Sequence, residues 1–120
     1  MAITFADGAK NVALSGIRDY SASGVTNFSI GAYPTGGSAD SEIARSSAFA
    51  YNSPSGGAMA LPSNVVINIP AGNTVVILRV LKNTYPNDWD VVSKDITPEE
   101  FTFAGSITVT TATISINDPA

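Results

Sequence analysis

Residues 65–81 read VVINIPAGNTVVILRVL, two β-branched apolar runs on either side of a Pro-Ala-Gly-Asn turn signal. The first run alternates with a period of two, its apolar residues facing inward and Asn68 facing outward, as in a half-buried strand. The second run, 74–81, is apolar almost throughout, which indicates burial on both faces or a central place in a sheet. Proline fixes φ, and glycine and asparagine accept positive φ, so a turn is predicted between the two runs.

The segment 105–117 predicts a second long strand with a change of phase. Ile107 and Val109 alternate with threonines, but the next apolar residues are Ala112, Ile114 and Ile116. One extra residue in an alternating strand swaps its two faces, as a β-bulge does. We therefore predict a bulge or bend near 110–111, in a strand that runs along two surfaces.

Shorter patterns add further elements. Strands are predicted at 28–33, 45–51, 59–61 and 91–96. Residues 97–100, TPEE, have the composition of a helix start, with threonine as the cap, proline at the first position and acids in the first turn. The two phenylalanines that follow limit this helix to about one turn.

Residues 7–16 predict a short helix, with a strand, turn and strand around Asp7-Gly8 as the alternative. Seven or eight short strands separated by turn signals predict an all-β fold, an antiparallel β-sandwich of jelly-roll-like type with this one N-terminal helix. The expected organisation is a single domain over 1–120, in which 1–7 form an arm that orders on docking.

Composition excludes several kinds of chemistry. The 120 residues are 44% hydrophobic and 13% charged, carry a net charge of −4, and include no histidine and no cysteine. Thiolate nucleophiles, Ser-His triads and His/Cys zinc sites are therefore excluded, and clustered cations for nucleic acid are lacking. The longest apolar stretch, 75–81, contains Arg79, so no membrane partner is expected. We expect no enzyme, no cofactor and no metal.

The segment 83–90, NTYPNDWD, is the strongest candidate for a contact surface. Tyr85 and Trp89 are the residue types that dominate interface hot spots and that stack on sugars. The alternative is a hairpin loop whose tryptophan covers the end of the core. Asn87, Asp88 and Asp90 offer oxygen ligands for Ca²⁺, but no glutamate completes such a loop, and solvated or capping acids are the favoured interpretation.

Other candidates have simple structural interpretations. The acids in 40–42 are expected to cap a turn, and Glu99-Glu100 to begin the helix predicted above rather than form a glycosidase carboxylate pair. Arg79 interrupts the most apolar strand, which places it either on an exposed face of an edge strand or, as we favour, paired across a subunit contact. Tyr33 is a further candidate contact for a partner or a carbohydrate.

Five features follow one another along the chain. They are the segment 28–33 before a Gly-rich acidic turn at 34–43, the Ala/Arg/aromatic strand 44–51, Gly56-Gly57-Ala58, the Pro-Ala-Gly-x-Thr-Val unit within 65–81, and the Phe-x-x-Ala-Gly ending that starts at Phe101. Their order is similar to that of small bacteriophage virion proteins of the tail-fibre, decoration and minor structural types. The chain departs from that pattern at 79–83, where an aromatic-Gly segment is usual, and by an insertion-like stretch at 83–90.

The resemblance implies a virion structural protein that is made in the host cytoplasm. Its preferred form is a capsid decoration subunit, a homotrimer that docks on other virion proteins such as the major capsid protein. The alternatives are a tail or fibre subunit and a carbohydrate- or receptor-binding module. The predicted partner-binding residues are Tyr85, Trp89, Arg79 and Tyr33.

Overall fold

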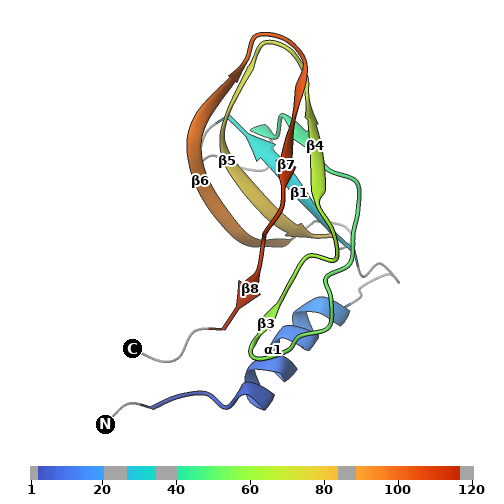
Figure 1. Ribbon diagram of the computed structural model, residues 1–120, viewed down its shortest axis with the longest axis vertical. Helices are drawn as coiled ribbons and strands as arrows, with labels where there is room; N and C mark the ends of the chain where they lie inside the picture. Colours follow the sequence, from blue (N-terminus) through green and yellow to red (C-terminus); the bar gives the residue numbers. More distant parts are fainter. Residues whose placement is uncertain (1–2, 21–26, 35–40, 84–88, 117–120) are drawn as a thin grey trace.

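The computed structural model describes residues 3–20, 27–34, 41–83 and 89–116, which form antiparallel strands and one N-terminal helix (Figure 1). The expected all-β, sandwich-like fold with a short N-terminal helix is confirmed. No helix in these residues is long and apolar enough to cross a membrane. In chain order the elements are α1 Asp7–Asp19, β1 Phe28–Tyr33, β2 Ala44–Arg45, β3 Ala58–Met59, β4 Val65–Ile69, β5 Asn73–Lys82, β6 Trp89–Phe101, β7 Gly105–Val109 and β8 Ile114–Ser115.

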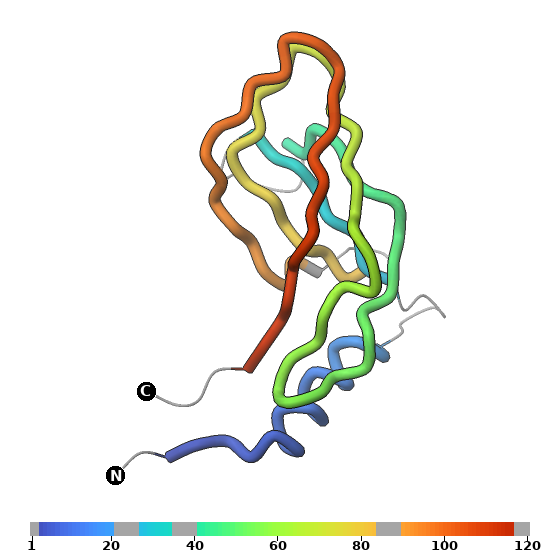
Figure 2. The backbone as a smooth tube through the Cα atoms, in the orientation of Figure 1, coloured from blue at the N-terminus to red at the C-terminus, as the bar shows by residue number. Residues whose placement is uncertain are grey.

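Strands β3 to β8 form one long antiparallel hairpin that is folded over on itself. The pairs nest, because β5 pairs with β6, β4 with β7 and β3 with β8. The first arm of this hairpin is β3 to β5 and the second arm is β6 to β8. Asn73 lies opposite Phe101, and Ile69 opposite Gly105, so the two arms bend together with no change of register between these pairs. Figure 2 shows the arms passing side by side over one end of the molecule. Nested antiparallel pairing of this kind is typical of jelly-roll folds.

The predicted turn at 70–73 is confirmed and lies where the hairpin folds over. Gly72 has a φ of 84°, a left-handed conformation that glycine adopts without a steric penalty. Its N–H donates to the Phe101 carbonyl at 2.7 Å, which ties the first arm to the second. The Asn73 amide donates to the Pro70 carbonyl at 3.0 Å. The turn of one arm is therefore held by the other.

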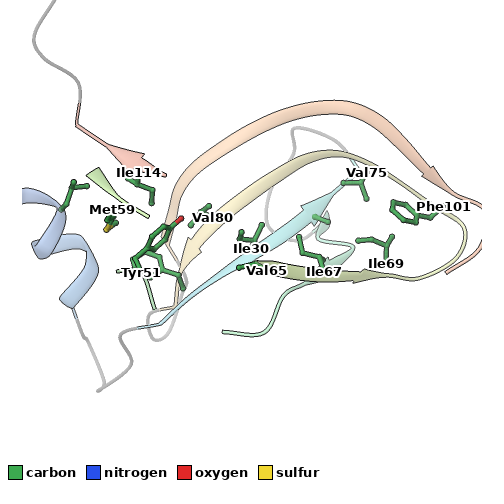
Figure 3. Close-up of a cluster of buried hydrophobic side chains, with 13 residues drawn as sticks. Ile30, Tyr51, Met59, Val65, Ile67, Ile69, Val75, Val80, Phe101 and Ile114 are labelled. Atoms are coloured by element: carbon green, nitrogen blue, oxygen red, sulfur yellow. The ribbon is translucent and has the colours of Figure 1, made fainter. Parts of the chain in front are cut away.

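The core lies between a four-stranded sheet, in the order β2-β1-β5-β6, and the β4–β7 pair. Strand β4 alternates buried and exposed residues, as its sequence pattern predicts. Strand β5 lies between β1 and β6, which confirms its predicted central place. Figure 3 shows the buried side chains of the two layers in one cluster, among them Ile30, Val75 and Val80 from the sheet and Val65, Ile67 and Ile69 from β4, with Phe101 at its end.

Helix α1 lies against the β3–β8 end of the molecule (Figure 1). Its Leu14 side chain is fully buried in the core. The Gly57 N–H donates to Asn11 Oδ1 at 2.9 Å, and Arg18 Nε donates to the Tyr51 carbonyl at 2.7 Å. These apolar and polar contacts fix both the position and the direction of the helix.

An aromatic cluster joins the helix end of the core to the sheet. Phe28 meets Tyr51 edge to face with ring centroids 4.9 Å apart, and Phe49 meets Tyr51 at 5.4 Å. The Tyr51 hydroxyl donates to the Ala112 carbonyl at 2.7 Å, so the one polar atom of this buried ring is satisfied. Lys82 Nζ lies 4.5 Å from the centroid of the Phe28 ring.

The helix predicted at 97–100 is wrong, because these residues belong to the 13-residue strand β6. Strand β6 is an edge strand, where a proline without an N–H is tolerated. Val75 lies opposite Glu99 and Ile77 opposite Asp95, so Pro98 falls in a bulge between these pairs. The bulge removes the need for a proline N–H in the ladder, and the long pairing with β5 outweighs the local capping signal.

The predicted phase change in 105–117 is confirmed as a break in the strand. Strand β7 pairs with β4 up to Val109, and β8 pairs with β3 from Ile114. The predicted strand at 45–51 is shorter, with β2 followed only by an isolated bridge between Phe28 and Phe49. The N-terminal helix continues past Gly16 to Asp19.

Candidate functional site

A row of side chains crosses the face of the four-stranded sheet that points away from β4. Gly31 lies opposite Arg45 on one side and Arg79 on the other, and Arg79 lies opposite Ser93. Tyr33, two residues along β1, shares this face because strand side chains alternate. The sheet register therefore gathers two arginines and a tyrosine from three strands.

These residues are joined by Glu42, which precedes β2. The Tyr33 hydroxyl donates to Glu42 Oε2 at 2.7 Å. Arg45 donates from Nε to Glu42 Oε1 at 2.9 Å and from NH2 to Glu42 Oε2 at 2.8 Å, a two-pronged contact that fixes the carboxylate. The guanidinium of Arg79 lies 4.7 Å from the centroid of the Tyr33 ring, and its NH1 is 3.2 Å from Asp90 Oδ2. We call Tyr33, Glu42, Arg45, Arg79 and Asp90 the tyrosine cluster.

Gly31 makes room for the ring at the centre of the tyrosine cluster. A Cβ at this position would lie 2.8 Å from Glu42 Oε2 and 3.0 Å from Tyr33 Cε1. The Tyr33 side chain is fully buried, with its hydroxyl bonded and its ring beneath Arg79. The two carboxylates and the two guanidiniums of the cluster neutralise each other's charge. Their contacts, together with the Tyr33 ring, link strands β1, β2, β5 and β6.

Burial and a bonded carboxylate change the titration of Tyr33. Burial is the main cause that raises its pKa to about 12, and the hydrogen bond to Glu42 and the negative charge of that group add to the effect. Burial also raises the pKa of Tyr51. Both hydroxyls therefore stay protonated in the folded chain at a pH where an exposed tyrosine ionises.

We expect the free energy of unfolding to fall as the pH rises through about 10 towards 12. The folded pKa values are raised, so the stabilising contribution is complete below the unfolded pKa of about 10 and is lost above it. Lys82 changes the free energy of unfolding in the opposite direction, because burial lowers its pKa, but this change levels off above the unfolded lysine pKa of about 10.4. Urea titrations at pH 8, 10 and 11 measure the trend, which Tyr33→Phe should weaken. An equal slope in wild type and variant would contradict the assignment to Tyr33.

The structure brings two of the four predicted contact residues together. Tyr33 and Arg79 are in direct contact, and β6 begins at Trp89, opposite Lys82. Tyr85 lies outside the described residues, as do Asn87 and Asp88. The predicted role of all four in partner binding stays a prediction.

The interpretation of Arg79 needs correction. Strand β5 is central, so Arg79 does not lie on an edge strand. Its side chain is only 12% exposed and pairs with Asp90 of the same chain. A contact of Arg79 with a second subunit stays a prediction. Glu42, expected to cap a turn, instead holds Tyr33 and Arg45. The three-residue spacing of Glu42 and Arg45 does not predict their pairing, because it brings side chains together on a helix and residues 42–45 are not helical.

A second feature is a cleft of about 360 Å³ at the side of the sandwich. It lies between β6 and the β7–β8 arm, and its lining includes Leu78, Val80, Ile96, Val109 and Ile114. Lys94 is the only charged residue that the described part of the chain contributes to the lining. We call this feature the open cleft. Its chemistry suits apolar side chains rather than a polar substrate.

Carboxylates do not gather into a reactive pair or a metal site in the part of the chain that the structure describes. Glu99 and Glu100 are neighbours on a strand, so their side chains leave on opposite faces. No three His, Cys, Asp or Glu side chains among residues 3–20, 27–34, 41–83 and 89–116 are placed to hold a metal ion. Of the three oxygen ligands considered in 83–90, the described one, Asp90, binds Arg79.

Comparison of the chain with protein-family models, with curated proteins and with solved structures finds no match.

Proposed function

We propose that the chain is a structural subunit of a bacteriophage virion, in its most concrete form a capsid decoration subunit. It docks as a homotrimer on neighbouring capsid subunits and stabilises the particle, without catalysis. The segment order that resembles small virion proteins supports this role. So does a surface with few charges, several of which are paired with one another in the tyrosine cluster.

One observation carries the proposal: exposed apolar side chains lie at opposite ends of an elongated molecule. The principal extents are 50 × 37 × 26 Å. Phe103, 83% exposed, lies in the turn from β6 to β7 at one end, and Val12, 73% exposed, lies on α1 at the other (Figure 1). Two such contact points suit a subunit that bridges neighbours on a lattice, where many weak contacts add up.

The direct test uses virus particles purified from the source of this sequence. Antibodies against the chain should detect it in the particles, and particles stripped of it should lose heat stability and regain it when the purified chain is added. Light scattering behind a sizing column should give the mass of three chains of 12.3 kDa. A chain that is absent from the particles, and that does not bind stripped ones, would overturn the proposal.

We expect Phe103→Ala to weaken binding to stripped particles by about 30-fold or more, because a buried aromatic anchor is worth about 2 kcal/mol or more at an interface. The fold should be unaffected, since this side chain is exposed. Thr102→Ala, in the same turn and also exposed, is the matched control and should bind as wild type does. Equal binding by Phe103→Ala would show that this end of the molecule does not contact the capsid.

A further inference from the structure

The open cleft is bounded by two strand edges to which no strand of the described residues is paired. Strand β6 is the last strand of the four-stranded sheet, and β7 and β8 each pair with one strand on a single side. Backbone N–H and C=O groups on such edges can accept an added strand, whose alternate side chains would enter the cleft.

The two edges differ in charge. Strand β6 carries Lys94, Asp95, Glu99 and Glu100, the kind of charged residues that protect an edge from unwanted pairing. The β7–β8 arm, residues 105–116, carries no charge and is rich in threonine, serine and isoleucine. The edge of the β7–β8 arm is therefore the one that can pair with another strand.

The chain itself contains a segment of matching chemistry just before α1. Residues 3–6, Ile-Thr-Phe-Ala, are uncharged and alternate large apolar with small or polar residues. Ile3 is 72% exposed and Phe5 47% exposed, and Ala6 has the extended backbone angles of φ −65° and ψ 145°. Ile3 and Phe5 would share one face of a strand, which fits the apolar lining of the open cleft.

The helix that follows this segment favours a second copy as the recipient. Contacts from Asn11 and Arg18 fix α1 to the rest of the chain. Figure 1 shows the segment before α1 leaving from the helix end of the molecule, towards which β8 also lies, whereas β6 and β7 lie above it. In this arrangement Ile3 stays exposed on its own copy.

We propose that residues 3–6 of one copy add as a short strand to the β7–β8 edge of a second copy, with Ile3 and Phe5 in its open cleft. Each copy both gives a segment and receives one, so the contact is heterologous and closes into a ring when the rotation permits. The inference rests on the cleft and the segment and not on the capsid role, so either can fail without the other.

The absence of cysteine from the chain allows a clean cross-linking test. Two single variants are mixed, Ile3→Cys and Thr113→Cys, the second at a residue that lines the open cleft. Mild oxidation should give a disulfide between the two variants, identified by mass. Thr108→Cys, on β7 but outside the cleft lining, is the matched control and should give at least tenfold less product with Ile3→Cys.

Two outcomes would overturn the exchange. One is equal cross-linking at Thr108 and Thr113. The other is a disulfide that forms only inside one chain when Ile3→Cys and Thr113→Cys are combined.

In a second measurement, Ile3→Asp should reduce the solution mass to one chain, and Thr4→Asp, on the other face of the segment, should leave the oligomer intact. Circular dichroism confirms that both variants are folded, and an unchanged mass for Ile3→Asp would contradict the proposal.

Discussion

Phe28→Ala is expected to lower the free energy of unfolding by about 3–5 kcal/mol, the range for removing a buried aromatic ring. Phe28 is fully buried, meets Tyr51 edge to face and Phe49 in a stacked arrangement, and lies beneath the ammonium of Lys82. Its removal leaves a cavity at the point where β1, the chain after β2 and the hairpin arms meet. These neighbours belong to different elements, so a single side-chain shift cannot close the cavity.

Phe103→Ala is the matched control, because it removes the same ring from a side chain that is 83% exposed. Its free energy of unfolding should stay within about 0.5 kcal/mol of wild type, as at most surface sites. Urea unfolding followed by circular dichroism measures both variants. Losses of similar size in the two variants would show that Phe28 does not occupy the buried position described here.

Local patterns in the sequence predicted the strands of the folded hairpin well. Period-two alternation located β4, near-continuous apolarity indicated the central place of β5, and the phase change at 110–111 marked the break between β7 and β8. These features depend on which face of a strand is buried, and the pattern of apolar and polar residues along the strand indicates that face directly.

Features that depend on distant partners were harder to predict. Residues 97–100 carry a local capping signal, but their pairing with β5 overrides it, and the bulge that accommodates Pro98 is visible only once the register is known. The same limit applies to the tyrosine cluster, because Tyr33 and Arg79 meet only through the pairing of β1 with β5. The burial of Lys82 had no local signal, since it depends on where α1 ends.

Lys82→Ala is expected to lower the free energy of unfolding by about 2–5 kcal/mol, the range for truncating a long buried side chain. Lys82 is fully buried at the end of β5, and Nζ donates to the Arg18 carbonyl, in the last turn of α1, at 2.6 Å. A lysine at this end of a helix satisfies a carbonyl that has no partner within the helix and complements the helix dipole. The substitution removes both the buried stem and the ammonium, which contacts the Phe28 ring and the Arg18 carbonyl.

Lys82→Met separates these two contributions, because it keeps an unbranched stem and removes only the ammonium. Burial lowers the pKa of Lys82, helped by the nearby Arg18 and opposed by Asp19, so the site disfavours the charge that it holds. Loss of the hydrogen bond is therefore offset by relief of desolvation, and we expect Lys82→Met to lose less than half as much stability as Lys82→Ala. Wild type should gain stability relative to Lys82→Met as the pH rises towards 10.4, since the unfolded lysine then binds more protons than the folded one. Equal losses in both variants, measured by urea unfolding at pH 7, would instead make the ammonium tether the main contribution of this residue.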